Sequence, residues 1–94
     1  MSPRRPPAGW RPARGGRAIR KTYVLKDFAA AVDFIVRIAR AAEAADHHPD
    51  LRLTRYRRLD VALTTHSAGG VTDRDRRLAA RIESLPRADF SSAR

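Results

Sequence analysis

The chain has 94 residues, a length that allows one small domain with one modest hydrophobic core. It has no cysteine, which excludes disulfides and thiolate-held metal or iron–sulfur sites, and no apolar stretch long enough to span a bilayer. The N-terminus also lacks the apolar segment of a secretory signal, so the sequence predicts a cytoplasmic protein.

The net charge of +10 suggests an anionic partner such as nucleic acid, but the distribution of the charge weakens this interpretation. Residues 1–21 carry seven basic residues and no acidic one, which leaves thirteen basic against ten acidic residues in 22–94. Eighteen of the twenty basic residues are arginine, a bias that a GC-rich genome can produce without any function in binding. Nucleic-acid binding is therefore a minor alternative, and no membrane partner is expected.

Residues 1–9 hold three prolines and two arginines, and we expect them to form a disordered basic arm. Trp10 is the first residue that a hydrophobic core would hold. The folded domain is therefore predicted to span 10–86, with a C-terminal tail at 87–94.

The first half of the domain predicts a hairpin followed by a helix. Gly15 and Gly16 fit a hairpin turn, and residues 18–25 alternate as a half-buried strand with Ile19, Tyr23 and Leu25 on one face. Asp27 can cap a helix that runs to about Ala45, before Pro49. Its predicted apolar stripe is Phe28, Ala31, Val32, Ile35, Ile38, Ala39 and Ala42.

The second half predicts two strands and a second helix. Residues 51–56 and 57–66 alternate and are expected to pair through a tight connection near Arg57, with Tyr56 packing as a strand aromatic. A capping box at Thr72-x-x-Asp75 starts a helix that Pro86 ends, after the loop Ala68-Gly69-Gly70. The order of elements predicts an α+β fold: an antiparallel four-stranded sheet with helices packed on one face.

All three histidines lie at predicted element ends, where a rigid scaffold can hold reactive groups in a cleft. His47 and His48 follow the long helix, and His66 ends the last strand. Imidazoles suit proton transfer near neutral pH because their ordinary pKa is about 6.5. A plainer alternative is that the histidine pair only interacts favourably with the dipole at the C-terminal end of the helix. Another alternative is a zinc ion bound by the three imidazoles. Adjacent histidines rarely converge on one ion, so no metal is predicted.

Two acidic residues near the histidines have ordinary explanations from spacing alone. Asp75 is as well explained by helix capping as by a role in a site. Glu43 lies one helical turn before His47, where a solvated or salt-bridged side chain is common.

The residues around the histidines form an ordered set with compatible spacings. The set is Glu43-x-x-x-His47-His48-Pro49, Tyr56, Thr65-His66 and Gly69-Gly70-Val71-Thr72-x-x-Asp75, preceded by Gly9-Trp10, Ile19 to Phe28, and Phe34. Over roughly residues 9–85 this pattern resembles the pterin-4a-carbinolamine dehydratase family.

The resemblance implies a lyase that removes water from the 4a-carbinolamine left by aromatic amino-acid hydroxylases and gives the quinonoid dihydropterin, with no cofactor or metal. By position, His47 and His66 match the family's acid–base pair, and His48 matches the histidine that binds and orients the pterin. The resemblance also implies substrate contacts at Asp46, Thr64, Thr65 and Ser67. It implies that two acidic residues, Glu43 and Asp75, support the site.

The resemblance also implies a homodimer or homotetramer and a possible pathway partner, an aromatic amino-acid hydroxylase. The family usually opens with a helix before the tryptophan, and the Pro/Arg arm of 1–9 does not provide one. The alternative function is a non-enzymatic dimerisation, assembly or transcriptional cofactor module of the same fold. Such a module does not need all three histidines, so their presence favours catalysis.

Overall fold

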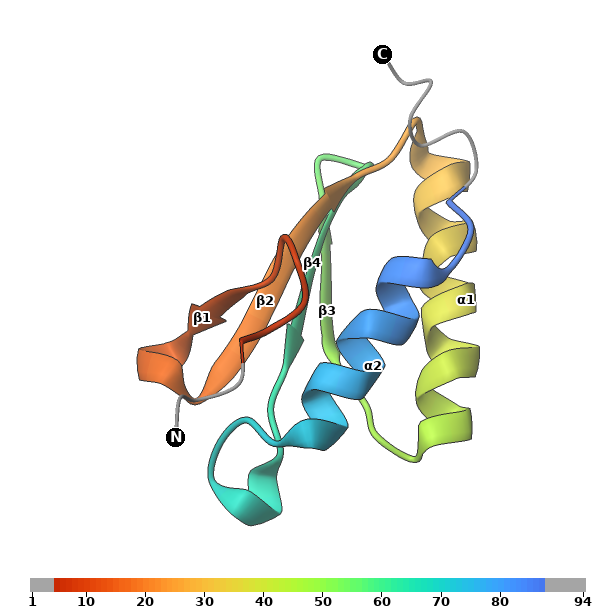
Figure 1. The fold of residues 1–94 in the computed structure, drawn as a ribbon. Coiled ribbons are helices and arrows are strands. Elements are labelled where there is room, and N and C mark those ends of the chain that lie inside the picture. Colours follow the sequence, from red (N-terminus) through yellow and green to blue (C-terminus); the bar gives the residue numbers. More distant parts are fainter. Residues whose placement is uncertain (1–4, 88–94) are drawn as a thin grey trace.

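The computed structural model describes residues 5–87, which form a four-stranded antiparallel sheet with two helices on one of its faces (Figure 1). The spatial order of the strands is β1-β2-β4-β3. The elements in chain order are β1 (Arg11–Ala13), the 3-10 turn η1 (Arg14–Gly16), β2 (Ala18–Val24), α1 (Phe28–Ala45), β3 (Asp50–Thr54), β4 (Arg58–Leu63), the 3-10 turn η2 (His66–Ala68) and α2 (Asp73–Ser84). The α+β sheet-and-helix fold and the hairpin turn at Gly15 and Gly16 are confirmed. The described part of the predicted arm, residues 5–9, contains no helix, and the rest of the arm and positions 88–94 of the tail lie outside the described residues.

The alternation in the strands selects the buried face of the sheet, as predicted. On β2, Ile19 and Tyr23 face the helices, while Arg20 is exposed. On β4 the buried residues are Leu59, Val61 and Leu63. Because side chains alternate with a period of two, these residues form one continuous apolar surface beneath the helices.

The predicted strands 51–56 and 57–66 are both too long, and the prediction for Tyr56 is wrong. β3 ends at Thr54, and Arg55 and Tyr56 both have positive φ (49° and 55°). Two consecutive residues of this kind make the tight turn whose twist matches the strands that it joins. Tyr56 is therefore 60% exposed at a turn and does not pack in the sheet.

The helix α1 begins as predicted, with the Asp27 carboxylate accepting a hydrogen bond from the Ala30 amide at 2.8 Å. Its buried face differs in part from the predicted stripe. Phe28 is 56% exposed, Val32 is exposed and so is Ala39, whereas the buried residues are Ala30, Ala31, Phe34, Ile38, Ala41 and Ala42. Apolar residues occupy most of the circumference of this helix, so periodicity alone does not select the half that meets the sheet.

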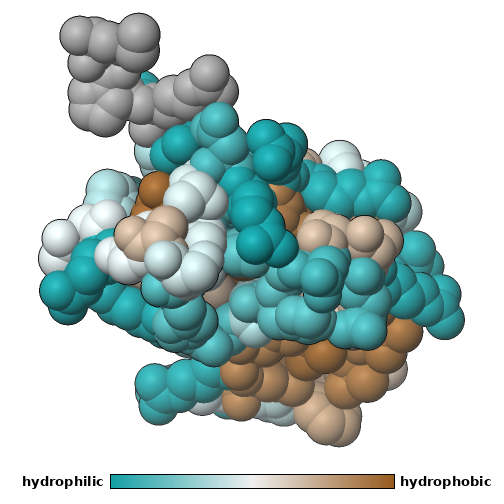
Figure 2. Space-filling model, turned by 90° about the horizontal axis from the view of Figure 1, so that it is seen from below, coloured by the Kyte–Doolittle hydropathy of each residue, from teal (hydrophilic) through white to brown (hydrophobic). Residues whose placement is uncertain are grey.

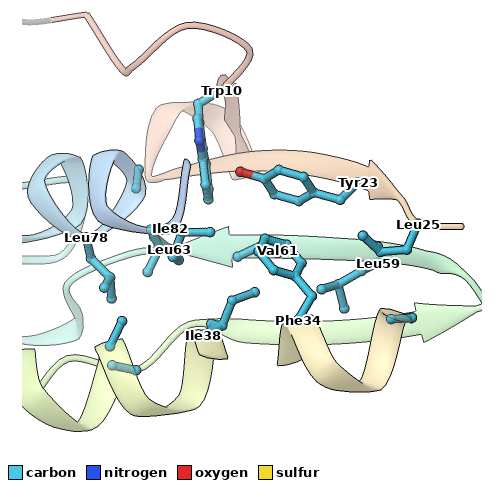
Figure 3. Packing of buried hydrophobic residues seen from close by; sticks show 14 of the residues in the cluster. Trp10, Tyr23, Leu25, Phe34, Ile38, Leu59, Val61, Leu63, Leu78 and Ile82 are labelled. Carbon is cyan, nitrogen blue, oxygen red and sulfur yellow. The ribbon is translucent and has the colours of Figure 1, made fainter. Parts of the chain in front are cut away.

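The core lies between the sheet and the two helices (Figure 3). Tyr23 of β2 and Phe34 of α1 meet edge to face, with ring centroids 5.0 Å apart. The Tyr23 hydroxyl donates to the Glu83 carboxylate of α2 at 2.6 Å, and Lys21 donates to the same oxygen at 2.8 Å. Burial, together with the neighbouring Glu83, raises the pKa of Tyr23 well above its usual value, so this hydroxyl stays protonated and ties α2 to the sheet.

The ends of four segments meet at one pole of the molecule. Figure 1 shows the end of α1, its connection to β3, the end of β4 with η2, and the start of α2 at the same end of the fold. Every candidate site residue named above comes from these segments. Among residues 5–87, no helix is both long enough and apolar enough to cross a membrane.

Phe34→Ala should lower the free energy of unfolding by about 3–5 kcal/mol, because it leaves a cavity where the fully buried ring meets Tyr23. Arg40→Ala, six residues along the same helix at an exposed side chain, is the control and should change stability far less. Urea denaturation measures both, and equal losses would contradict the assigned buried face.

Candidate active site

The end of α1 turns sharply and brings two histidines to the pole. Asp46 caps the helix in the left-handed conformation (φ 51°, ψ 44°), which aspartate tolerates better than most residues. The Asp46 amide donates to the carbonyls of Ala42 and Glu43, and the His47 amide donates to that of Ala42 at 3.1 Å. The turn therefore separates His47 from His48: the first enters the protein and is 8% exposed, and the second faces solvent.

Asp75, in the first turn of α2, is fully buried and accepts three hydrogen bonds. His47 Nε2 lies 2.6 Å from Asp75 Oδ1. The second oxygen, Oδ2, accepts from the Thr65 hydroxyl at 2.7 Å and from the Thr72 amide at 2.8 Å. The predicted capping box is confirmed, and the capping carboxylate also binds the histidine.

The Thr65 hydroxyl takes part in a chain with a fixed direction. Its one proton goes to Asp75, so the Thr72 hydroxyl, 2.8 Å away, must donate to Thr65. The Thr72 hydroxyl in turn accepts from the Arg74 amide at 3.2 Å. The chain of hydrogen bonds therefore runs from the Arg74 amide through the hydroxyls of Thr72 and Thr65 to the Asp75 carboxylate.

These hydrogen bonds set the charge of Asp75 and the tautomer of His47. Burial alone would raise the pKa of the Asp75 carboxyl, but the hydrogen bonds from His47, Thr65 and Thr72 outweigh it, and the pKa lies below its usual 3.8. An ionised carboxylate can only accept, so Nε2 of His47 carries the proton. Its other ring nitrogen, Nδ1, has no hydrogen-bond partner among residues 5–87 and is available for proton transfer.

His48 and His66 are both exposed at the same pole. His48 Nε2 lies 2.5 Å from Oε2 of Glu43, five residues earlier in the chain. His66 begins η2 in a closed loop, because Thr65 and Gly70 exchange two backbone hydrogen bonds at 3.0 and 3.3 Å. Gly69 completes this loop with a positive φ of 71°, a conformation that favours glycine. The loop fixes the backbone from which the His66 side chain projects.

The remaining predicted site residues flank this arrangement. Asp46 is exposed, and its carbonyl accepts from Arg74 at 2.6 Å. The Thr64 hydroxyl donates to the Arg17 carbonyl at 2.5 Å, and Ser67 is exposed within η2. Within residues 5–87, no three histidine or acidic side chains are grouped so as to hold a metal ion, and His47 and His48 bind different carboxylates.

Sequence reasoning missed Arg74, which joins the start of α2 to the end of α1. Together with Arg77, Arg81 and His47, this arginine lines a cleft of about 390 Å³ between the two helices. The three arginines follow each other at steps of three and four, a helical spacing that the sequence does contain. The signal was hidden by the abundance of arginine in the whole chain.

Comparison with known proteins gives one consistent family. Residues 2–85 match the family model described as "Pterin 4 alpha carbinolamine dehydratase". A protein from Rhodopseudomonas palustris strain HaA2, provisionally named pterin-4-alpha-carbinolamine dehydratase, is 49% identical over 78 residues, which is 83% of this chain and 76% of the relative. A similarly named protein from Roseiflexus sp. strain RS-1 is 47% identical over 82% of this chain and 80% of the relative.

Two solved structures share the fold. A "transcriptional coactivator/pterin dehydratase" from Brucella melitensis superposes with a TM-score of 0.76 at 39% identity, over 82% of this chain and 81% of that one. A pterin dehydratase-like protein identified as a RuBisCO assembly factor in the α-carboxysome gives a TM-score of 0.70 over 83% and 89% of the two chains. Its identity of 18% supports the shared fold alone.

Asp75→Asn should destabilise the protein by about 1–3 kcal/mol at neutral pH, because it removes a buried charge that accepts three hydrogen bonds. The pKa of Asp75 is lowered by folding, so its contribution is complete above the ordinary value of 3.8 and disappears as the pH falls through the lower folded-state pKa. Thermal unfolding across a pH series measures this difference. Asp33→Asn, at an exposed ion pair with Arg37, is the control and should cost less than about 1 kcal/mol. A loss for Asp75→Asn that did not shrink in acid would contradict this account.

Proposed function

The chain belongs to the pterin-4a-carbinolamine dehydratase family and is a hydro-lyase of 4a-hydroxy-tetrahydropterins, and from this premise we propose that His47 and His66 transfer the protons while His48 binds the substrate. The observation that carries the proposal is the buried pair of His47 and Asp75 at the pole where His48 and His66 also lie.

The reaction requires two proton transfers. The bond between C4a and the hydroxyl oxygen breaks as this oxygen gains a proton and leaves as water. N5 loses its proton, and the electron pair of the N5–H bond forms the C4a=N5 double bond of the quinonoid product. One group must give a proton and another must take one, and both are tasks for imidazoles near neutral pH.

His47 is suited to accept the N5 proton. Nδ1 is the free acceptor of this ring, and protonation there produces an imidazolium whose Nε2–H still faces the ionised Asp75. The carboxylate accepts the Nε2 proton at 2.6 Å and so holds the ring with Nδ1 free to take a proton. The hydrogen bonds of Thr65 and the Thr72 amide hold the carboxylate in place, so these two residues position the base.

His66 then protonates the departing hydroxyl, since it projects from a closed loop at the same pole and is open to solvent. His48, supported by Glu43, orients the pterin ring. Asp46, Thr64 and Ser67 complete the contacts with the substrate. The substrate is the 4a-carbinolamine product of an aromatic amino-acid hydroxylase, which would be the pathway partner of this enzyme.

We also propose that the protein forms a homodimer or a homotetramer. The support is a set of large apolar side chains that the single chain leaves exposed: Phe28, Val32 and Val36, which follow one another at steps of four on α1, and Leu51 on β3. In the view from below, hydrophobic surface gathers along one side of the molecule (Figure 2). Burying such a face against a second copy removes it from water, which favours association.

Replacing both proton-transfer residues, His47→Ala with His66→Ala, should lower the rate of 4a-hydroxy-tetrahydropterin dehydration by at least about 100-fold. A coupled hydroxylase assay, corrected for spontaneous dehydration, measures this loss. His48→Ala is the contrast and should raise KM more than it lowers kcat, because it removes a binding contact. Undiminished activity in the double variant would rule out the assigned roles.

Val32→Glu with Val36→Glu should shift the protein toward the monomer, because two charges would enter the apolar contact. Sedimentation equilibrium gives the mass of each variant. Val24→Glu is a matched control, because this side chain is 43% exposed on β2 while Val32 and Val36 are 41% and 42% exposed. A wild-type protein that sediments as a monomer would refute the oligomer.

A further inference from the structure

The cleft between α1 and α2 has walls of different character. From α1 it receives only the small side chains of Ala41, Ala44 and Ala45, beyond which His47 follows. From α2 it receives the long side chains of Arg74, Arg77 and Arg81 beside Leu78. Small residues facing long cationic ones leave an open space of about 390 Å³ with guanidinium groups along one wall.

The charge in this cleft is uncompensated. No aspartate or glutamate is among its lining residues in the described part of the chain. Other arginines are paired: Arg37 with Asp33, Arg76 with Asp73 and Arg87 with Glu83. The side chains of Arg77 and Arg81 form no ion pair or hydrogen bond with any residue between 5 and 87. These two cations are therefore available to a ligand.

The spacing of the three arginines opposes helix stability. Arg74 and Arg77 are three residues apart and Arg77 and Arg81 are four apart, which makes them neighbours on one face of α2. Like charges at these spacings destabilise a helix by a few tenths of a kcal/mol per pair. An oxyanion bound between them would remove this repulsion and satisfy several donors at once, because guanidinium groups match phosphate and carboxylate geometry.

The cleft continues from the proposed catalytic site. His47 lines it, and Arg74 reaches across it to the Asp46 carbonyl. The two helices run in opposite directions along the sheet (Figure 1), so Arg81 lies farther from the pole than Arg74. Seven residues of α-helix separate these two arginines by roughly 10 Å. This distance suits a side chain attached to the pterin ring, with the ring itself at the histidines.

We propose that this cleft binds an oxyanion on the side chain of the substrate, so that the enzyme prefers tetrahydropterins whose C6 side chain ends in a phosphate or carboxylate. The proposal rests on the proposed function, since it places the pterin ring at the histidines. Arg77 and Arg81 hold the oxyanion, and Arg74 links that contact to the backbone beside His47.

Calorimetric titration at low ionic strength tests the preference with three 7,8-dihydropterins that differ only at the end of the C6 side chain: neutral trihydroxypropyl, its terminal phosphate ester, and a carboxylate. We expect at least one of the two anionic compounds to bind about tenfold more tightly than the neutral one, and whichever binds better identifies the class. Added salt should reduce the preference.

Arg77→Ala with Arg81→Ala should bring the ratio of affinities close to one while leaving thermal stability equal or higher, since it also removes the repulsion. Arg52→Ala with Arg58→Ala, on the sheet face away from the helices, makes the same change in charge and should keep the ratio. A loss of the ratio in both double variants would mean general charge attraction and would overturn the proposal.

Turnover of the neutral 4a-hydroxy substrate separates this inference from the proposed function. Turnover with equal affinity for the three compounds would refute the oxyanion site and leave the dehydratase assignment intact. A preference for an anionic compound without turnover would support the site while contradicting the histidine roles. Failure of all three compounds to bind would overturn the inference.

Discussion

The carboxylate of Asp75 is the point at which the separate parts of the site meet. It lies in the first turn of α2 and receives hydrogen bonds from the end of α1, from the segment after β4 and from its own helix cap. A buried charge of this kind is unfavourable unless it is fully satisfied, so the three donors must come together when the chain folds. The same interaction closes the pole and fixes the tautomer of His47.

The sheet makes this meeting possible. In the order β1-β2-β4-β3, β4 lies in the interior of the sheet, and its end points to the pole where α1 finishes (Figure 1). The two helices are held over one face by the core around Tyr23 and Phe34, and Glu83 fastens the far end of α2 to β2. Rigid packing away from the pole therefore limits the positions that the histidines can take, which is what proton transfer requires.

Stability and function place different demands on α2. Its first turn is well compensated, since Thr72 and Asp75 form a complete capping box and Asp73 pairs with Arg76. Its face toward α1 carries arginines at repelling positions with no acidic residue in the cleft. Asp73 lies four residues before Arg77, a favourable spacing for an ion pair, but it pairs with Arg76. The uncompensated face is what an anionic ligand would use.

Several features of the fold and of the site follow from local patterns in the sequence. The period of two in β2 and β4, the Asp27 cap, the box at Thr72 and Asp75, and the positions of the histidines at element ends all depend on residues close in the chain. Four features could be read only from the structure. The buried half of α1 depends on how the helix rolls on the sheet, and Tyr56 is exposed because the turn has two residues of positive φ. The contact between His47 and Asp75 joins residues 28 apart, and the arginine cleft joins two helices. The exposure of Tyr56 follows from a local backbone conformation, whereas the other three features depend on the way elements pack against one another, so no local pattern could reveal them.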